Sequence, residues 1–301
     1  MPQVQANGIT IEYESFGPAD REAILLIMGL GAQLTMWPAE LCNELVARGY
    51  RVIRFDNRDV GLSTKFDAAG MPDMAVIFGA LMSGQPAKSA YSLDDMAADA
   101  MGLLDALDIG RAHIVGASMG GMIAQLVAIN HPDRVLSLTS IMSTTGNPGL
   151  PQAKPEAMAV LMTPAPEGDI EAAISRGINA WQTIGSPGYP TDEKILREWV
   201  GRDAKRSLYP VGTARQMAAI VANGDRREKL KKLKVPAVVL HGGDDPLVPV
   251  EGGKDTAANI PGAELVVVPG MGHDFPIALV KTFADAISKA TARAGSAKAA
   301  E

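Results

Sequence analysis

A serine between two glycines, in Gly116-Ala117-Ser118-Met119-Gly120, separates an apolar run from a helical pattern. Residues 112–115 predict a short buried strand, and the pattern that follows predicts a helix to about residue 130. Gly-x-Ser-x-Gly in a strand-to-helix turn is typical of a nucleophile elbow, where serine adopts a strained backbone and its Oγ stands clear of the sheet. The motif also occurs by chance, so a base, an acid and oxyanion donors must accompany it.

Histidine is the general base that a serine nucleophile requires, and the chain has four histidines. His273 lies in a glycine-rich loop after the predicted strand 263–268, at the edge of the sheet where Ser118 is expected. We expect His113 and His131, before and after the elbow, to serve the structure. His241 ends another predicted strand, and we expect it to brace the loop that carries the acid.

Two adjacent aspartates, Asp244 and Asp245, follow the predicted strand 235–240. Their side chains should point in different directions, so only one of them can orient His273. We assign this role to Asp245, the residue before the proline. The alternative explanation of the pair is turn formation, because Asp-Pro initiates turns. The order Ser118, Asp245, His273 along the chain is the order found in α/β-hydrolases.

An oxyanion hole needs two backbone N–H groups directed at the developing negative charge. We expect the first from Met119, directly after the nucleophile, and the second from Leu30, in the loop after the strand 23–28. The sequence Gly29-Leu30-Gly31 is not a dinucleotide fingerprint, because Leu34 occupies the position of the third glycine.

Strand and helix patterns alternate along most of the chain, which predicts an α/β fold with a mostly parallel sheet and helices on both faces. Residues 3–16 predict a hairpin with its turn at Asn7-Gly8. Further strands are expected at 23–28, 51–55, 112–115, 135–142, 235–240 and 263–268, and helices at 38–48, 92–107, 251–259 and 274–290. Residues 144–225 contain no convincing strand and predict a helical cap inserted between the core segments 1–143 and 226–301. We expect the tail 289–301 to be frayed.

Composition limits the possible partners. The net charge is −6, so a nucleic-acid partner has no electrostatic support, and we expect the basic segment 226–232 to form a solvated helix face. A single cysteine excludes a disulfide framework and a cysteine-based metal site, and we expect no cofactor or metal. The sequence shows neither a secretory signal nor an apolar run long enough to span a membrane, so we expect a cytoplasmic protein.

The whole chain resembles α/β-hydrolases in the glycine loop, in Phe55-Asp56-Asn57-Arg58, in the serine motif, in His241-Gly242-x-x-Asp245-Pro246 and in Pro269-Gly270-Met271-Gly272-His273. More narrowly, residues 54–64 and Met28-Gly29 are similar to the aclacinomycin methylesterase branch. This resemblance implies hydrolysis of a carboxylic ester, small or polymeric, without indicating which ester. Many hydrolases have His-Gly and Arg-Gly where this chain has Met28-Gly29 and Arg58-Asp59, so a histidine that often braces the oxyanion loop is absent.

Several reactions remain open for this combination of residues. A serine nucleophile argues against the haloalkane dehalogenases and epoxide hydrolases of this fold, which use aspartate. The same triad serves carboxylesterases, lactonases, thioesterases, C–C bond hydrolases and perhydrolases. A non-catalytic ligand-binding protein is the alternative from another class, and the complete set of Ser118, Asp245 and His273 disfavours it.

Methionines near the expected site suggest an adaptable apolar pocket, although filling gaps in a core explains them equally well. The residues expected to line the substrate pocket are Gly29, Met122, Met158, Met162 and Trp181. Two other candidates in the loop after the strand 51–55 are given structural roles. We expect Arg58 to tie this loop through a salt bridge and Ser63 to belong to the loop structure.

Overall fold

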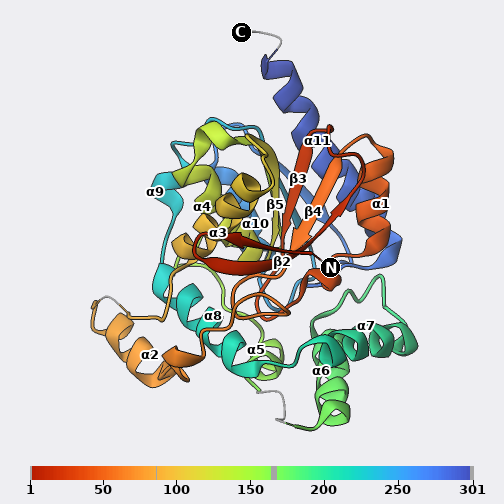
Figure 1. Cartoon of the computed structure of the whole chain (residues 1–301). Coiled ribbons are helices and arrows are strands. Elements are labelled where there is room, and N and C mark those ends of the chain that lie inside the picture. The colour runs from red at the N-terminus through yellow and green to blue at the C-terminus, as the bar shows by residue number, and fades with distance from the viewer. Residues whose placement is uncertain (1, 86, 164–167, 299–301) are drawn as a thin grey trace.

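The computed structural model describes residues 2–85, 87–163 and 168–298 of the chain, and its described part contains an eight-stranded sheet (Figure 1). The strands are β1 (Gln3–Ala6), β2 (Ile9–Phe16), β3 (Ala23–Ile27), β4 (Arg51–Phe55), β5 (Ala112–Ala117), β6 (Val135–Ile141), β7 (Ala237–Gly242) and β8 (Glu264–Val268). Their order across the sheet is β1-β2-β4-β3-β5-β6-β7-β8. β2 runs antiparallel to β1 and β4, and the other neighbouring strands are parallel. The predicted fold class is therefore confirmed.

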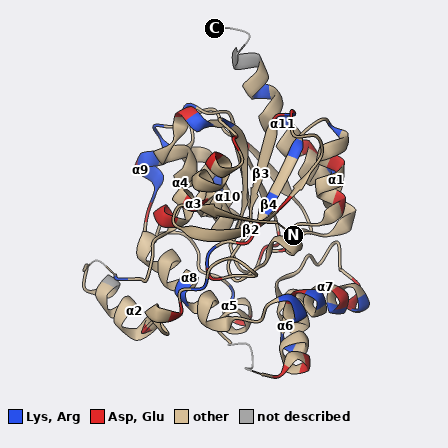
Figure 2. Cartoon of the chain, in the orientation of Figure 1, with Lys and Arg blue, Asp and Glu red and all other residues tan. Residues whose placement is uncertain are grey.

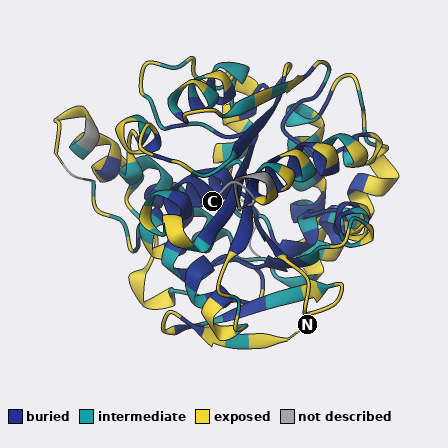
Figure 3. Cartoon of the chain, turned by 90° about the horizontal axis from the view of Figure 1, so that it is seen from above, coloured by how far each residue is buried: buried dark blue, intermediate teal, exposed yellow. Residues whose placement is uncertain are grey.

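Helices cover both faces of this sheet. The helices of the described residues are α1 (Ala39–Ala47), α2 (Met74–Met82), α3 (Leu93–Ala106), α4 (Met119–Asn130), α5 (Pro155–Met162), α6 (Ile170–Ile184), α7 (Glu193–Arg206), α8 (Pro210–Asn223), α9 (Arg227–Leu230), α10 (Val250–Asn259) and α11 (Val280–Lys298), and not all of them lie against the sheet. Ile24 and Leu26 of β3 join the apolar cluster beneath α1 and α11. Leu25 and Ile27 join the opposite cluster, beneath α3 and α4. This alternation explains the continuous apolar run of β3, which is buried on both faces. Figure 3 shows strands at the centre of the molecule in the dark blue of buried residues.

Four helices, α5 to α8, lie within residues 144–225, between β6 and β7, and the described residues of that segment contain no strand. These helices are located at one end of the sheet in Figure 1. α6 and α7 have a small apolar cluster of their own, built on Ile174, Ile178, Leu196 and Val200. A Cβ added at Gly177 would lie 2.5 Å from Val200 Cγ1, so the glycine permits the close packing of the two helices.

The C-terminal tail differs from its prediction. Over residues 289–298, α11 continues as a helix instead of fraying, and residues 299–301 of the predicted tail lie outside the described residues. Alanine, which dominates this stretch, has the highest helix propensity, and Ala290 and Ala294 are buried. Arg293 adds an anchor, since its Nη1 donates to the carbonyl oxygen of Ala237 at 3.0 Å. The helix also begins later than expected, because Pro276 precedes a 3₁₀ turn at Ile277–Leu279.

The basic segment 226–232 is only partly the solvated face that the sequence predicts. Figure 2 shows basic residues of α9 in blue at the surface, but Arg226 is 2% exposed. Its guanidinium donates to Gln125 Oε1 (3.0 Å) and to the carbonyl oxygen of Thr144 (2.7 Å). Burial lowers the pKa of Arg226 to about 10, against the attraction of Asp225. Arg226 therefore ties the segment of residues 144–225, called the insertion below, to α4, and it does not belong to a surface patch.

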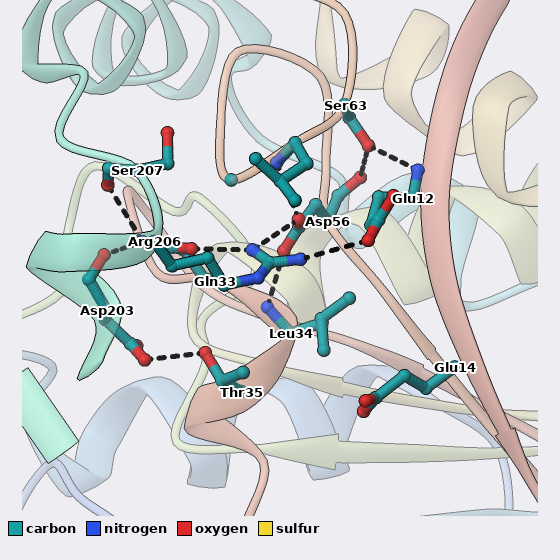
Figure 4. Close-up of polar contacts among 12 residues, drawn as sticks. Glu12, Glu14, Gln33, Leu34, Thr35, Asp56, Ser63, Asp203, Arg206 and Ser207 are labelled. Carbon is teal, nitrogen blue, oxygen red and sulfur yellow. Dashed lines mark hydrogen bonds and ion pairs between the residues drawn. The ribbon is translucent and has the colours of Figure 1, made fainter. Parts of the chain in front are cut away.

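The last turn of α7 is anchored in the core by a polar cluster (Figure 4). Arg206 Nη1 lies 2.7 Å from Asp56 Oδ2, and the Asp56 side chain is 0% exposed. Gln33 Nε2 donates to the carbonyl oxygens of Asp203 (2.6 Å) and Ser207 (2.9 Å). Asp56 also accepts from the N–H of Leu34 at 2.8 Å. One buried carboxylate thus joins α7 to the loop that follows β3.

We predict that Arg206→Met lowers the free energy of unfolding by about 3 kcal/mol or more, because it leaves the buried Asp56 carboxylate without the guanidinium that compensates it. Urea denaturation measures the loss. Arg197→Met is the matched control, because Arg197 and Glu171 form an exposed pair at 3.7 Å, and the expected loss is below about 1 kcal/mol. Equal losses in the two variants would contradict the prediction.

Candidate active site

Ser118 forms the tip of a sharp turn between β5 and α4, with φ 56° and ψ −121°. A Cβ added at Gly116 would lie 2.0 Å from the carbonyl oxygen of Gly120. A Cβ added at Gly120 would lie 2.0 Å from the carbonyl oxygen of Ile27. Both glycines are therefore required by the close approach of strand and helix. The serine is half-buried between buried neighbours, so its side chain stands at an accessible point.

Hydrogen bonds hold the unusual backbone of Ser118 in place. Its N–H donates to the carbonyl oxygen of Ile141 at 2.9 Å. Its carbonyl oxygen accepts from Ser143 Oγ at 2.8 Å and from the N–H groups of Gly121 (2.9 Å) and Met122 (3.2 Å). A left-handed serine costs free energy and persists only where its surroundings determine it, as they do here.

His273 and Asp245 are in direct contact, with His273 Nδ1 2.7 Å from Asp245 Oδ2. The other carboxylate oxygen, Oδ1, accepts from the N–H groups of Leu247 (2.9 Å) and Val248 (2.8 Å). Burial alone would raise the pKa of Asp245, but the positive charge of His273 and the hydrogen bonds from His241 and His273 hold it below its ordinary value. The carboxylate therefore stays ionised.

Asp244, the other candidate acid, faces away from the imidazole. Its Oδ2 accepts from the N–H of Gly270 at 2.7 Å, and its own N–H donates to the carbonyl oxygen of Met271 at 3.0 Å. Asp244 thus holds the loop that carries His273, while Asp245 holds the ring.

The other histidines lie apart from this pair or support it. His241 is fully buried, with Nε2 2.7 Å from the carbonyl oxygen of Val248 and 3.5 Å from Asp245 Oδ2. It braces the acid loop, as the sequence indicates. His113 contacts Ser137 Oγ at 2.9 Å within the sheet, and His131 caps the end of α4.

The loop after β3 lies against the serine. A Cβ added at Gly29 would be 3.1 Å from Ser118 Cβ and 3.6 Å from its Oγ. Asn57 Nδ2 donates to the carbonyl oxygen of Met28 (2.9 Å), and Gln216 Oε1 accepts from the N–H of Gly31 (2.8 Å). These two bonds hold the loop on either side of Leu30.

The two expected oxyanion donors lie on the two elements next to Ser118, Met119 at the start of α4 and Leu30 in the loop after β3. Met119 is the first residue of α4, where N–H groups have no acceptor within the helix. Leu30 is half-buried between the two anchored residues of the loop. Sequence reasoning identified neither anchor: Asn57 belongs to the motif Phe55–Arg58, which was a usable signal, whereas nothing near Gln216 in the sequence pointed to this loop.

The five expected pocket residues lie on four elements. Gly29, in the loop after β3, lies beside Ser118. Met122 lies one turn into α4 and packs in the core beneath it. Met158 and Met162 on α5 are 39% and 47% exposed, and Trp181 of α6 packs against the small cluster of α6 and α7.

The loop after β4 is tied by buried charge pairs. Arg58 binds both carboxylate oxygens of Asp99, at 2.6 and 2.7 Å, so it forms the expected salt bridge. Ser63 Oγ donates to the carbonyl oxygen of Asp56 at 2.6 Å, which is the expected structural role. Sequence reasoning missed the pair of Asp59 and Arg215, whose Nε–Oδ2 distance is 2.7 Å and which joins α8 to this loop. Burial opposes ionisation of Asp59, but its bonds to Arg215 lower its pKa.

The described residues contain neither a candidate metal site nor a helix that could span a membrane. No group of three or more His, Cys, Asp or Glu side chains among them could hold a metal ion. No described helix is both long and apolar enough to cross a membrane. Cys42 is buried, and burial raises the pKa of its thiol to about 11.

Comparisons with known proteins agree with the fold described above. Residues 22–277 match the model of the alpha/beta hydrolase fold family. Rhodomycin D methylesterase DauP from Streptomyces sp. (strain C5) is 28% identical over 304 residues, which cover 93% of this chain and 94% of the relative. Rhodomycin D methylesterase DnrP from Streptomyces peucetius is 29% identical over 306 residues, with the same coverage of 93% and 94%.

The names of other similar proteins indicate different reactions. 3-Oxoadipate enol-lactonase 2 from Acinetobacter baylyi is 27% identical over 266 residues, which cover 87% of this chain and 86% of the relative. The solved structure of a meta-cleavage product hydrolase from Pseudomonas fluorescens IP01 has a TM-score of 0.74 at 20% identity and covers 98% of both chains. That likeness shows the shared fold.

The lowered pKa of Asp245 predicts a pH dependence of stability. Because its folded-state pKa lies below the unfolded value of about 3.9, ionisation of Asp245 stabilises the fold above about pH 5, and this contribution is lost as the pH falls. The free energy of unfolding of the wild type should therefore fall more steeply from about pH 5 to pH 3 than that of Asp245→Asn. Urea denaturation at each pH measures both slopes. Asp20→Asn, at an exposed position, should keep the wild-type slope, and equal slopes in wild type and Asp245→Asn would refute the prediction.

Proposed function

Since the chain belongs to the alpha/beta hydrolase fold family, we propose that it is a carboxylic-ester hydrolase with Ser118 as its nucleophile. One observation carries the proposal: the buried contact of 2.7 Å between His273 and Asp245 at the sheet edge where Ser118 has its strained turn. β5, β7 and β8 run in the same direction, so the residues that follow their carboxyl ends share that edge.

The proposed reaction begins with proton transfer from Ser118 to Nε2 of His273, while Oγ attacks the ester carbonyl carbon. Asp245 accepts the Nδ1–H bond and thereby keeps Nε2 free of its proton. The N–H groups of Leu30 and Met119 bind the negative oxygen of the tetrahedral intermediate. His273 then protonates the departing alcohol, which leaves an acyl group on Ser118. A water activated by the same imidazole releases the carboxylic acid and restores the serine.

We propose a small-molecule ester as the substrate, bound beneath a cap formed by residues 144–225. The names of two relatives, both rhodomycin D methylesterases, support an ester with a small alcohol group. Gly29, which lies beside Ser118, and the partly exposed methionines of α5 are among the proposed pocket residues. Met122 and Trp181 complete the proposed lining from α4 and α6.

A lactonase is the second candidate, because a relative is named 3-oxoadipate enol-lactonase 2. A lactone is a cyclic ester, so the same residues open it by the same steps, and the released alcohol remains attached to the acyl group. Hydrolysis of lactones with a higher kcat/KM than that of open-chain methyl esters would favour this candidate.

We predict that Ser118→Ala lowers kcat by about 10⁴-fold or more, because it removes the nucleophile. Hydrolysis of p-nitrophenyl esters of graded chain length, of methyl esters and of lactones measures the loss, and circular dichroism checks the fold. Ser83→Ala is the matched control, since Ser83 is exposed on the surface and should leave kcat unchanged. Near-wild-type activity in Ser118→Ala would exclude the proposed nucleophile.

The two aspartates should respond differently to the same conservative substitution. Asp245→Asn should lower kcat by about 10⁴-fold, because an amide cannot hold the imidazole in the required tautomer. Asp244→Asn retains a carbonyl oxygen that can accept from Gly270 N–H, so most of the activity should remain. Steady-state kinetics on one p-nitrophenyl ester compares the variants, and the reverse order would assign the acid role to Asp244.

A further inference from the structure

The loop that carries His273 is bonded to the segment between α6 and α7, residues 185–192. The N–H of His273 donates to the carbonyl oxygen of Ile184, the last residue of α6, at 2.7 Å. The N–H of Gly188 donates to the carbonyl oxygen of Gly270 at 2.8 Å. The proposed base thus receives a direct backbone contact from the helical insertion, about 90 residues earlier in the sequence.

One hydroxyl group in this segment bonds to the residues on both sides of His273. Ser186 Oγ accepts from the N–H of Gly272 at 2.9 Å and donates to the carboxylate of Asp274. Ser186 is 3% exposed and Asp274 is 8% exposed, so water does not compete freely for these bonds. Burial raises the pKa of Asp274, and the hydrogen bonds from Ser186 counteract that rise.

Glycines permit this approach from both segments. A Cβ added at Gly272 would lie 2.3 Å from the carbonyl oxygen of Gly185, and one added at Gly188 would lie 2.9 Å from Gly270 Cα. Side chains at these positions would separate the two backbones. The contact between the two segments therefore requires a glycine in each of them, at Gly188 and at Gly272.

The core holds the opposite side of the same loop. Asp244 bonds to Gly270 and Met271, and Asp245 bonds to the imidazole of His273. The loop is consequently clamped between the acid loop after β7 and the segment after α6. Release of either clamp would let the imidazole move relative to Ser118, and a misplacement of about 1 Å in an active site can cost about 100-fold in rate.

We infer that Ser186 is a positioning residue for His273, and that proton transfer from Ser118 requires the segment after α6 to be seated on the histidine loop. The inference rests on the proposed function, because it takes His273 as the base. It adds to that function a coupling between the insertion and the reacting groups, because a segment of the proposed cap also sets the position of the base.

The test measures the reactivity of Ser118 with a small covalent reagent in place of an ester substrate. Diisopropyl fluorophosphate phosphorylates an activated serine: the Oγ–P bond forms, the P–F bond breaks, the proton goes to the base and fluoride leaves. Ser186→Ala should slow this inactivation about 10- to 100-fold and lower kcat by a similar factor, with KM within about twofold of the wild type. Ser186→Thr keeps the hydroxyl and should recover most of both rates.

Thr183→Ala is the matched control in the same helix end, because Thr183 Oγ1 donates to the carbonyl oxygen of Asn179 within α6. It should react with the reagent as the wild type does. Gly188→Ala gives an independent test, since its Cβ would push the segment away from Gly270 while Ser186 stays unchanged. It should also slow the inactivation, and it decides the outcome if Ser186→Ala does not fold by circular dichroism.

The results separate the inference from the function on which it rests. A wild-type protein that the reagent does not modify at Ser118 would refute the proposed nucleophile. A wild type that is modified, with folded Ser186→Ala or Gly188→Ala variants modified equally fast, would refute the positioning role alone. A change in KM without a change in kcat or inactivation rate would also refute it, because it would assign Ser186 to substrate binding.

Discussion

A carboxylate without access to water is the constraint on which the candidate site depends. Asp245 is buried, and an isolated buried charge is so costly that it must be compensated or neutralised. Here two backbone N–H groups and two histidines surround it, so the charge survives and its pKa stays low. The need to compensate the Asp245 carboxylate explains the turn after β7, the contact from His241 and the position of the His273 ring.

Buried charges that must be compensated also hold the insertion to the core. Asp56 and Asp59 are both buried in the loop after β4, and each takes an arginine from the insertion, Arg206 and Arg215 respectively. Asp56 also receives the N–H of Leu34. The loop that carries the proposed oxyanion donor is therefore fixed by charges that must stay paired, and the helices above it cannot shift without exposing them. The contact between Ser186 and the histidine loop extends this dependence to the proposed base.

Most of the core could be predicted from the sequence, because its signals are local. Apolar runs of five or six residues marked the parallel strands, and the spacing of glycines around Ser118 marked the turn. The proposed triad could also be assembled, since residues after the carboxyl ends of parallel strands share one edge. The predictions for the tail and for Arg226 were wrong: buried alanines extend α11, and Arg226 bonds to Gln125 inside the molecule. Helix α2 was not expected, because its nine uncharged residues have no amphipathic period.

The sequence by itself determined the order of the strands along the chain, the elbow and the identities of the candidate nucleophile, base and acid. These depend on contacts between near neighbours in the chain, which leave a periodic or spaced pattern. The tertiary structure brings Asp245, the aspartate chosen from the sequence, to His273, and only the tertiary structure shows that Asn57, Gln216, Arg206 and Ser186 hold the loops around Ser118. Those side chains act across distances of about 30 to 190 residues, as Met28 with Asn57 and Gly31 with Gln216 do. A single sequence carries no pattern for such contacts, because the partners are far apart in the chain and only the complete fold brings them together.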